Sequence, residues 1–483
     1  MALPDQAESP GYLLRVERLT QTSCHKNRTI AVEHRDVVYR ARVSAAFVLV
    51  FALAGCGGGG GGGTGGGAVP PAPSAAPGPK RAQDVIKHIV IIVQENRSFD
   101  NLFHGFPGAD TVASGRASDG STVPLKPLSM AHGVDPSHNF ADFAASLDGG
   151  KMDGFDKVPG FPRDEKNLAY AYVPRAEAQP YFDLASAYAL ADRMFQSNNS
   201  ASYVSHQYLI AAQSANVVNN PVTLPWGCDA PTGTGVMLMG ASGAPYAAPN
   251  VAPCFDYQTI GDLLDAAGKS WAYYAPSIAN LSQDPAGALW TPYDAIRHIR
   301  YGADWSQNQI SPETTILADI AHSTLRNVTI VAPNALNSDH ARFPSTTGPA
   351  WVSSIVSAIG ASVYWKDTAI FVTWDDWGGW YDHVIPPHID ANGPGFRVPL
   401  IAISPFAKHG YVSHSQFETA SLTRYVEDTF GLGSLGQRDA TTTAPHDMFD
   451  YSQSVKPLSG IRLPASALRA ASLRAPPGVA PDD

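Results

Sequence analysis

HIVIIVQENRSFDN, residues 88–101, indicates the fold of this chain, because an apolar strand runs directly into a cluster of polar side chains. His88 to Val93 form the β-branched run expected of a strand buried on both faces, and the polar residues that follow offer helix caps. Glu95 and Asn96 therefore fall at the carboxyl end of a strand. In open α/β sheets ligands bind at that edge, and a carboxylate beside a carboxamide supplies two hard oxygen ligands. An ordinary strand-to-helix turn with a capping Asn is the alternative.

A second segment, AIFVTWDDWGGWYDHVIPPH at residues 369–388, repeats this pattern of an apolar strand followed by acids. Asp375 and Asp376 are adjacent and follow the apolar run Ala369 to Thr373. Neighbouring carboxylates repel each other unless a cation or a proton lies between them. Because strand residues alternate between faces, both acids can serve one ion only if the chain bends, which Gly378 and Gly379 permit. A solvated loop is the alternative. Against it stand four aromatic residues that are unusual in water, namely Trp374, Trp377, Trp380 and Tyr381.

Further apolar runs predict more strands of the same sheet. Helical patterns separate them, as at residues 259–267 and 350–358, and this alternation is typical of an α/β fold with a mostly parallel central sheet flanked by helices. We expect one domain over residues 84–463 and a flexible tail over residues 464–483, which are rich in Ala, Pro and Arg. The strand candidates are His88 to Val93, Val328 to Ala332, Ala369 to Thr373 and Pro399 to Ile403.

The pattern of residues 37–56 indicates a secretion signal rather than a part of the folded domain. Arg40 and Arg42 precede a short apolar run that ends in Leu53-Ala54-Gly55-Cys56, a pattern typical of a lipoprotein secretion signal. We therefore expect residues 37–56 to be the signal and Cys56 to carry a lipid. A buried strand or a short core helix is the alternative for the apolar run.

The segments around this signal follow from the same interpretation. Residues 1–36 are polar and are expected to be an over-extended start, with a genuine cytoplasmic extension as the alternative. Residues 57–83 are rich in Gly and Pro and are expected to form a tether. The domain would then be exported, either anchored to the membrane at the cell envelope through the lipid or secreted.

Composition narrows the class of protein. The net charge of −10 and the absence of a basic block argue against nucleic acid as a partner. A hydrophobic content of 44% supports a substantial core. The predicted domain retains Cys228 and Cys254, and a disulfide between them is expected in an exported protein. Two free buried cysteines are the alternative.

Four long motifs closely resemble segments of the bacterial phosphoesterase family, which comprises non-specific phospholipases C and related acid phosphatases. The resemblance covers roughly residues 84–455 and implies an alkaline-phosphatase-like α/β fold. The motifs are ENRSFDN at 95–101, GGKMDGF at 149–155, CFDYQTIGDLLDAAGKSWAYYAP at 254–276 and TWDDWGGWYDHVIPP at 373–387.

The resemblance implies a metal site made of four residues. Their donor atoms are hard oxygens, so a divalent ion such as Ca²⁺, Mg²⁺ or Mn²⁺ suits them better than Zn²⁺. The implied ligands are Glu95, Asn96, Asp375 and Asp376.

The resemblance also implies a hydroxyl nucleophile within FQSNNSASYVSHQYL, where Ser202 falls at the family position. A hydroxyl is a weak nucleophile until a metal or a base activates it. The common family form has Gly-Pro before the hydroxyl residue and Pro two places after it, whereas here Ser200-Ala201 precede and Val204 follows. Ser200 therefore remains an alternative nucleophile.

His138 in DPSHNF and His340 in NSDH match active-site histidines of the family. A histidinium both binds phosphate and protonates a leaving alkoxide, so these residues predict activity at acidic to neutral pH. Taken alone, each is more often a surface or capping residue. His298 and His383 are weaker candidates.

The resemblance thus implies an exported, metal-dependent phosphoric-ester hydrolase, similar to phospholipase C, that acts on a phospholipid or a small phosphoester through a covalent phosphoserine. A broad acid phosphatase acting on monoesters is the first alternative. A phospholipase must admit two acyl chains, and the aromatic loop 374–381 either forms an apolar lip for them or packs in the core. A catalytically inactive, surface-tethered binding protein is the second alternative, although such a protein would be free to lose the paired acids.

Overall fold

The computed structural model describes residues 79–162, 165, 167–279, 281–463 and 465–472. Contacts divide the chain into Met1–Ser74 and Ala75–Asp483, and the described residues belong to the second unit. The predictions for the start, the signal, Cys56 and most of the tether therefore lie outside the described residues. No helix within the described ranges combines the length and the apolar character needed to cross a bilayer.

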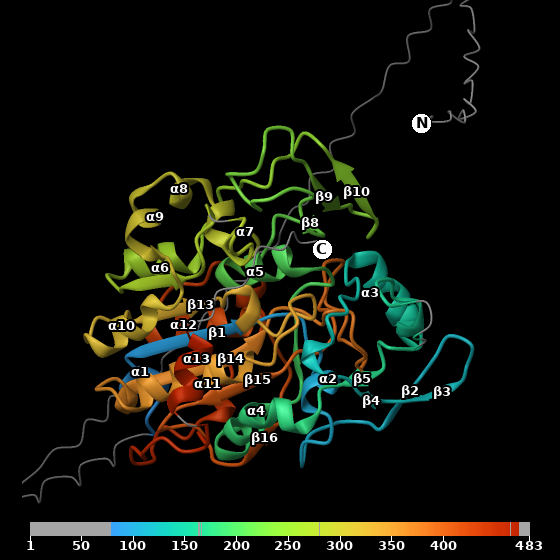
Figure 1. Ribbon diagram of the computed structural model, residues 1–483. Helices are drawn as coiled ribbons and strands as arrows, with labels where there is room; N and C mark the ends of the chain where they lie inside the picture. Colours follow the sequence, from blue (N-terminus) through green and yellow to red (C-terminus); the bar gives the residue numbers. More distant parts are fainter. Residues whose placement is uncertain (1–78, 163–164, 166, 280, 464, 473–483) are drawn as a thin grey trace, which may run out of the picture. The chain divides into compact units, whose positions relative to one another are not determined.

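Within the described residues, eight strands form the central sheet (Figure 1). Every strand runs in the same direction except β15, which pairs antiparallel with both of its neighbours. The prediction of a mostly parallel sheet is confirmed. In spatial order the strands are β12 (Gln309–Ile310), β11 (Trp271–Tyr274), β13 (Val328–Val331), β1 (His88–Gln94), β14 (Thr368–Trp374), β15 (Leu400–Ile403), β6 (Ala189–Ala191) and β16 (Tyr411–Ser413).

Short strands outside this sheet form smaller ladders. A three-stranded sheet joins β10 (Pro245–Ala248), β9 (Val236–Met239) and β8 (Val217–Val218). Three two-stranded ladders pair β17 (Phe417–Glu418) with β7 (Met194–Phe195), β2 (Ser114–Arg116) with β3 (Thr122–Pro124), and β4 (Lys126–Pro127) with β5 (Ala171–Tyr172).

Helices flank the central sheet, as the alternating pattern predicted. Contacts join α5 to α6 and α12, and join α11 to α4 and α13. The helices are α1 (Ala82–Val85), α2 (Phe99–Phe103), α3 (Phe140–Leu147), α4 (Arg175–Ala187), α5 (Ser202–Ala211), α6 (Ile260–Ala266), α7 (Ala286–Leu289), α8 (Arg297–Arg300), α9 (Ala303–Asn308), α10 (Thr315–Ala321), α11 (Gly348–Gly360), α12 (Ala420–Phe430) and α13 (Ala465–Ser472).

Helix α13 differs from the expectation of a loose tail over residues 464–483. Residues 465–472 are helical and contact α11, so this part of the predicted tail packs on the domain. Its Ala-rich composition, which suggested a loose segment, also favours helix formation once a packing surface is available.

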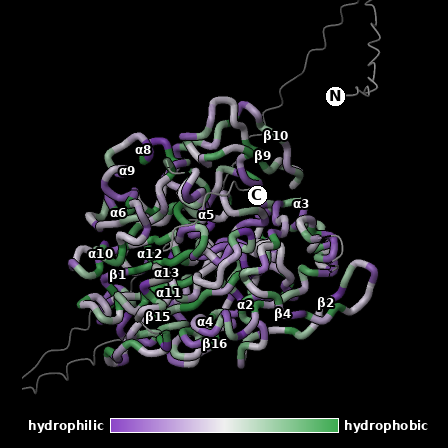
Figure 2. Tube along the Cα trace, viewed as in Figure 1, coloured by the Kyte–Doolittle hydropathy of each residue, from purple (hydrophilic) through white to green (hydrophobic). Residues whose placement is uncertain are grey.

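The register between β1 and β14 decides where the polar motifs meet. The two strands pair in parallel from His88↔Thr368 to Gln94↔Trp374. Both faces of β1 are covered, and Ile89 to Val93 are at most 2% exposed. Figure 2 shows hydrophobic residues concentrated around β1, β15 and α11. Because the strands end together at one edge, the segments that begin with Glu95 and Asp375 emerge side by side.

The aromatic residues after β14 belong to the interior. Trp374, Trp377 and Trp380 are at most 1% exposed and Tyr381 is 4% exposed. Trp377 packs edge-on against Phe155 and Phe396, with ring centroids 5.7 and 4.8 Å away. The interpretation of this loop as an apolar lip for acyl chains is therefore wrong. The loop belongs to the hydrophobic core, and Asp375 and Asp376 are buried with it.

Gly378 provides the predicted bend after the acid pair. Its φ is +61°, and a Cβ there would lie 2.3 Å from the carbonyl oxygen of Asn96. Gly379 also adopts a left-handed backbone, with φ +76°. Only glycine combines this conformation with so close an approach of two backbones.

Replacing Gly378 by Ala should lower the free energy of unfolding by roughly 1–3 kcal/mol, because the new methyl group both strains the left-handed backbone and displaces Asn96. Chemical denaturation monitored by circular dichroism measures this change. Gly433→Ala is the matched control, because no atom lies within 4 Å of a Cβ there. Equal stability of the two variants would contradict the close packing of the two motif loops.

Candidate functional site

Backbone hydrogen bonds hold the ends of three parallel strands together. Asp375 N–H donates to the carbonyl of Gln94 at 3.0 Å, and Asn96 N–H donates to Asp375 Oδ1 at 3.0 Å. Glu95 N–H donates to the carbonyl of Ser338, which lies beyond the end of β13, at 2.8 Å. The motifs at residues 95–101 and 373–387 are thereby fixed against each other at the carboxyl edge of the sheet, where α/β folds bind ligands.

The four predicted metal ligands all lie at this edge. Glu95, Asp375 and Asp376 are at most 2% exposed, and Asn96 is 1% exposed. Burying three carboxylates away from water costs free energy unless positive charge or hydrogen-bond donors balance them. The structure therefore brings together the ligand set that the sequence predicted.

Helix α5 places two side chains against these acids. Ser202, the first residue of the helix, donates from Oγ to Asp376 Oδ2 at 3.1 Å, and its Oγ lies 3.3 Å from the amide of Asn96. His206, one turn later, lies with Nε2 3.0 Å from Glu95 Oε1. Residues four apart share a helix face, which explains why both reach the same cluster.

His206 was not predicted as part of the site. The sequence signal was its position four residues after Ser202 in a helical stretch, but that spacing gains meaning only when Ser202 is known to face the acids. Burial lowers the pKa of His206 to about 4, although Asp375 opposes the shift. The imidazole is therefore uncharged at neutral pH and does not neutralise the carboxylates.

The cluster fits a metal ion. Glu95, His206 and Asp375 each contribute a ligand atom, and these atoms lie within 4.8 Å of one another. Ligands about 2.0–2.5 Å from one ion lie at most about 5 Å apart, so the spacing is compatible with a single ion. Asp375 Oδ2 is buried and has no hydrogen-bond partner among the described residues. Such an oxygen is available for coordination.

The tautomer of His206 is compatible with the same role. Tyr273 donates its hydroxyl proton to the carbonyl of Trp290 at 2.6 Å, so the phenol oxygen can accept Nδ1–H of His206, which is 3.4 Å away. That arrangement leaves the lone pair of Nε2 directed at the acids. A second group holding the far nitrogen is usual for a metal-binding imidazole.

His138 and His340 meet at the amide of Asn96. Nε2 of each imidazole lies 3.0 Å from this amide. The amide orientation that satisfies the surroundings turns its oxygen to both histidines and its nitrogen to Glu95 and Asp375. Asn96 adopts this place with φ +59°, a left-handed backbone that Asn tolerates better than most residues.

The other nitrogen of each histidine is also fixed. Nδ1 of His138 donates to the carbonyl of Pro136 at 2.9 Å, and Nδ1 of His340 accepts from Arg342 N–H at 3.2 Å. Nε2 of His138 lies 3.8 Å from Asp376 Oδ2. Both predicted histidines therefore present Nε2 to the cluster that contains Ser202.

Three other candidate residues do not contact the cluster formed by Glu95, Asp375 and Asp376. Ser200 Oγ donates to Asn219 Oδ1 at 3.0 Å and accepts from Asn219 N–H at 2.6 Å, so its hydroxyl is engaged elsewhere. His298 lies between Asp256 and Asp262, 2.6 and 2.8 Å away. His383 belongs to a second acidic group.

A second acidic group contains Asp100, Asp382 and His383. Arg397 fills it, because its Nε lies 2.8 Å from Asp382 Oδ1 and its Nη2 lies 3.5 Å from Asp100 Oδ1. The guanidinium supplies the positive charge that a metal would otherwise bring. We therefore assign this group to the packing of the motif loops rather than to ion binding.

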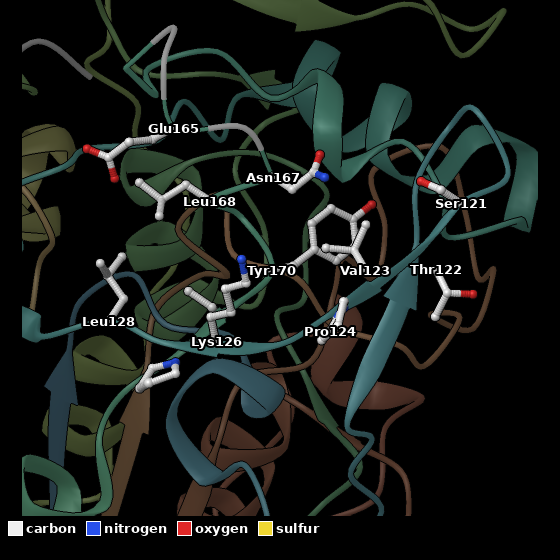
Figure 3. A pocket seen from close by; sticks show the side chains of 12 residues that line it. Ser121, Thr122, Val123, Pro124, Lys126, Leu128, Glu165, Asn167, Leu168 and Tyr170 are labelled. Carbon is white, nitrogen blue, oxygen red and sulfur yellow. The ribbon is translucent and has the colours of Figure 1, made fainter.

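A cavity of about 480 Å³ lies apart from the cluster (Figure 3). Val123 and Tyr170 line it together with Lys126 and Glu165, and none of its lining residues belongs to the acid and histidine cluster. The residues of that cluster are themselves at most 3% exposed. Because the acids, Ser202 and the two histidines lie together in the buried cluster, that cluster is the candidate functional site.

The structure joins Cys228 to Cys254 by a disulfide, as predicted. Cys228 N–H donates to the carbonyl of Asp294 at 2.8 Å, and Asp294 lies in the short helix Pro292–Ala295, which contacts α5.

Curated proteins are similar to this sequence over most of its length. "Phospholipase C B" of Mycobacterium tuberculosis is 26% identical over 443 residues, which cover 79% of this chain and 81% of that protein. "Non-specific phospholipase C4" of Arabidopsis thaliana is 26% identical over 416 residues, which cover 74% of this chain and 70% of that protein.

A solved structure described as a protein in the alkaline phosphatase superfamily, from Vibrio parahaemolyticus, has 12% identity and a TM-score of 0.34, with 81% of this chain and 86% of that chain covered. A similarity at that level adds nothing to the sequence relationship. The phosphoesterase family matches residues 86–433, which include every residue of the buried cluster. As its motifs predicted, this chain belongs to the phosphoesterase family and is a hydrolase acting on phosphoric esters.

Proposed function

We propose that this hydrolase is a metal-dependent enzyme similar to phospholipase C, in which Ser202 is the nucleophile and a covalent phosphoserine is formed. The observation that carries the proposal is the position of Ser202 Oγ, 3.1 Å from Asp376 above a buried group of acids and histidines. Names of the relatives support phospholipids as the substrate class.

The residues that would hold the ion are Glu95, His206 and Asp375, with Asn96 and Asp376 beside them. When bound, a divalent ion lowers the pKa of a neighbouring hydroxyl and neutralises phosphate oxygens. The imidazole of His206 changes the expectation for its identity. Nitrogen ligands suit Mn²⁺ or Zn²⁺ better than Ca²⁺, whereas the oxygens of the site alone favour Ca²⁺, Mg²⁺ or Mn²⁺.

The first chemical step follows from the hydrogen bond of Ser202. Asp376 accepts the proton of Ser202 Oγ as this oxygen attacks phosphorus, and the bond from phosphorus to the ester oxygen breaks. The imidazole pair, His138 and His340, presents Nε2 to the cluster and can donate to phosphate oxygens and protonate the leaving alkoxide. The products of this step are an alcohol and phosphoserine.

The second step regenerates the enzyme. A water molecule attacks phosphorus of the phosphoserine, loses a proton to the imidazole that donated one earlier, and displaces Ser202 Oγ, which recovers its proton from Asp376. The helix supports both steps, because Ser202 lies at the amino terminus of α5, where the helix dipole favours negative charge.

A monoester-specific phosphatase is the second candidate, and one observation favours it. The aromatic residues of the loop 374–381, for which a lip and a core position were both considered, are buried, for example Trp377 at 0% exposed, so that loop offers no lipid-binding lip. Purified protein assayed with phosphatidylcholine and with p-nitrophenyl phosphate separates the two candidates. We expect a higher kcat/KM for the phospholipid. Hydrolysis of the monoester alone would contradict the phospholipase proposal and leave the hydrolase assignment intact.

Ser202→Ala should lower kcat by about a thousandfold or more, because the covalent route is lost. Rapid quenching with a ³²P-labelled ester, followed by peptide mapping, should find the label on Ser202 in the parent protein. Ser200→Ala is the matched control and should stay within about threefold of the parent, since Ser200 is bonded to Asn219. Label on Ser200 would identify Ser200 as the nucleophile in place of Ser202. A parent protein that never becomes labelled would exclude a covalent intermediate.

Asp375→Asn should abolish high-affinity metal binding, because an amide carries no charge and ligand oxygens are lost at the centre of the cluster. Elemental analysis after dialysis measures the bound metal, and turnover with and without chelator measures its effect. Asp119→Asn, an exposed acid, is the control. An Asp375→Asn variant that keeps the parent's metal content would refute the assignment of this site.

Export and anchoring remain a proposal that rests on the sequence of residues 37–56. We expect Cys56→Ser to move the protein from the membrane fraction to the soluble fraction without changing its specific activity, because a lipid on Cys56 is the expected anchor. Cell fractionation followed by immunoblotting measures the distribution. The same distribution for parent and variant would contradict the anchor.

A further inference from the structure

A second cavity, of about 730 Å³, opens where α8 and α9 meet the edge of the sheet. We call it the Arg300 cavity. The residues that line it and carry the argument are Asp229, Ser277, Arg300, Trp305, Gln309 and Ser311. Its volume lies in the range of about 300–1,000 Å³ that is usual for small-molecule sites.

The guanidinium of Arg300 is held rigidly at the wall of this cavity. Nη2 donates to Asp229 Oδ2 at 2.6 Å, and Nε lies 3.0 Å from Asp294 Oδ1. The guanidinium also lies 4.4 Å from the ring centroid of Trp305. A guanidinium stacked on an indole makes a flat surface at a fixed angle.

Carboxylates outnumber cations around Arg300. Two carboxylates, Asp229 and Asp294, face one guanidinium, so the cavity carries no excess of positive charge. A site for free phosphate would leave its cations uncompensated to hold the anion. The arrangement therefore disfavours an anionic ligand.

The side-chain amide of Gln309 is left unsatisfied at this wall. Neither Nε2 nor Oε1 of Gln309 has a hydrogen-bond partner among the described residues, although both atoms are buried. A buried amide that makes no hydrogen bond costs free energy, which a ligand that offers both a donor and an acceptor would recover.

A hydroxyl group is both donor and acceptor, so adjacent hydroxyls can satisfy both atoms of the Gln309 amide. The carbon face of a polyhydroxylated ring also packs well on a flat stacked pair. We propose that the Arg300 cavity binds a neutral polyhydroxylated ring of the inositol type. A quaternary ammonium group offers neither a donor nor an acceptor and would leave the Gln309 amide without a hydrogen bond, so choline chemistry fits this cavity less well.

The position of the cavity connects it to the reaction. Ser311 follows β12 and Ser277 follows β11, so both lie at the same edge of the parallel sheet as Glu95. From β1 to β12 there are three strand spacings, about 14 Å in all. In Figure 1, α8 and α9 lie on the same side of the sheet as α5. Assigning the ring as the headgroup of the substrate rests on the proposed function, whereas binding of the free ring does not.

Saturation-transfer NMR on the full chain tests the proposal with myo-inositol as the probe and choline chloride as the comparison. We expect saturable binding of myo-inositol and at least about tenfold weaker binding in Gln309→Leu, which keeps the volume and removes both hydrogen-bonding atoms. Gln307→Leu, an exposed neighbour on α9, is the matched control and should bind as the parent does. Thermal melting reports whether each variant is folded.

Should Gln309→Leu fail to fold, Gln309→Glu serves instead, because its carboxylate lacks the donor and should weaken binding similarly. The proposal is overturned if myo-inositol does not bind saturably, if choline binds in its place, or if a folded Gln309 variant binds like the parent. A parent that binds myo-inositol but does not hydrolyse phosphatidylinositol would contradict the headgroup assignment and the phospholipase proposal, while supporting the ring-binding site.

Discussion

The exchange of hydrogen bonds between the ends of β1 and β14 is the constraint on which the site depends. Asp375 N–H donates to Gln94, and Asn96 N–H donates back to Asp375 Oδ1, each at 3.0 Å. This exchange fixes two polar segments against each other and gathers Glu95, Asp375 and Asp376 in an interior where unbalanced charge is costly. In our proposal a divalent ion offsets that cost. The ion that the chemistry needs would then also stabilise the fold.

Helix α5 connects this acidic edge to catalysis. Its first turn carries Ser202 at the positive end of the helix, and its second turn carries His206 against Glu95. In our proposal one helix thus positions both the nucleophile and an uncharged nitrogen ligand, so a shift of the helix would change both together. The two histidines approach from other loops and meet at Asn96, which makes that amide the common neighbour of the acids and the proton donors.

Long apolar runs made β1, β13 and β14 predictable, because buried parallel strands need them. Strands such as β12, with two residues, carry no such pattern and depend on their neighbours. The strand-end pattern predicted that Glu95 and the Asp375-Asp376 pair follow strands, and the structure brings them to one edge because the ends of parallel strands meet there, with Ser202 and His138, which the resemblance implied, beside them. His206 was missed because its role arises from the distance between α5 and β1. The burial of Trp377 was left open because sequence does not separate an exposed aromatic lip from a core.

The stereochemistry at phosphorus tests the central claim most directly. A phosphodiester made chiral at phosphorus with oxygen isotopes can be hydrolysed in isotopically labelled water, and the configuration of the product read by ³¹P NMR. Attack by Ser202 followed by attack of water inverts the configuration twice, so the account predicts overall retention. Net inversion would show a single displacement by water and would contradict the role assigned to Ser202.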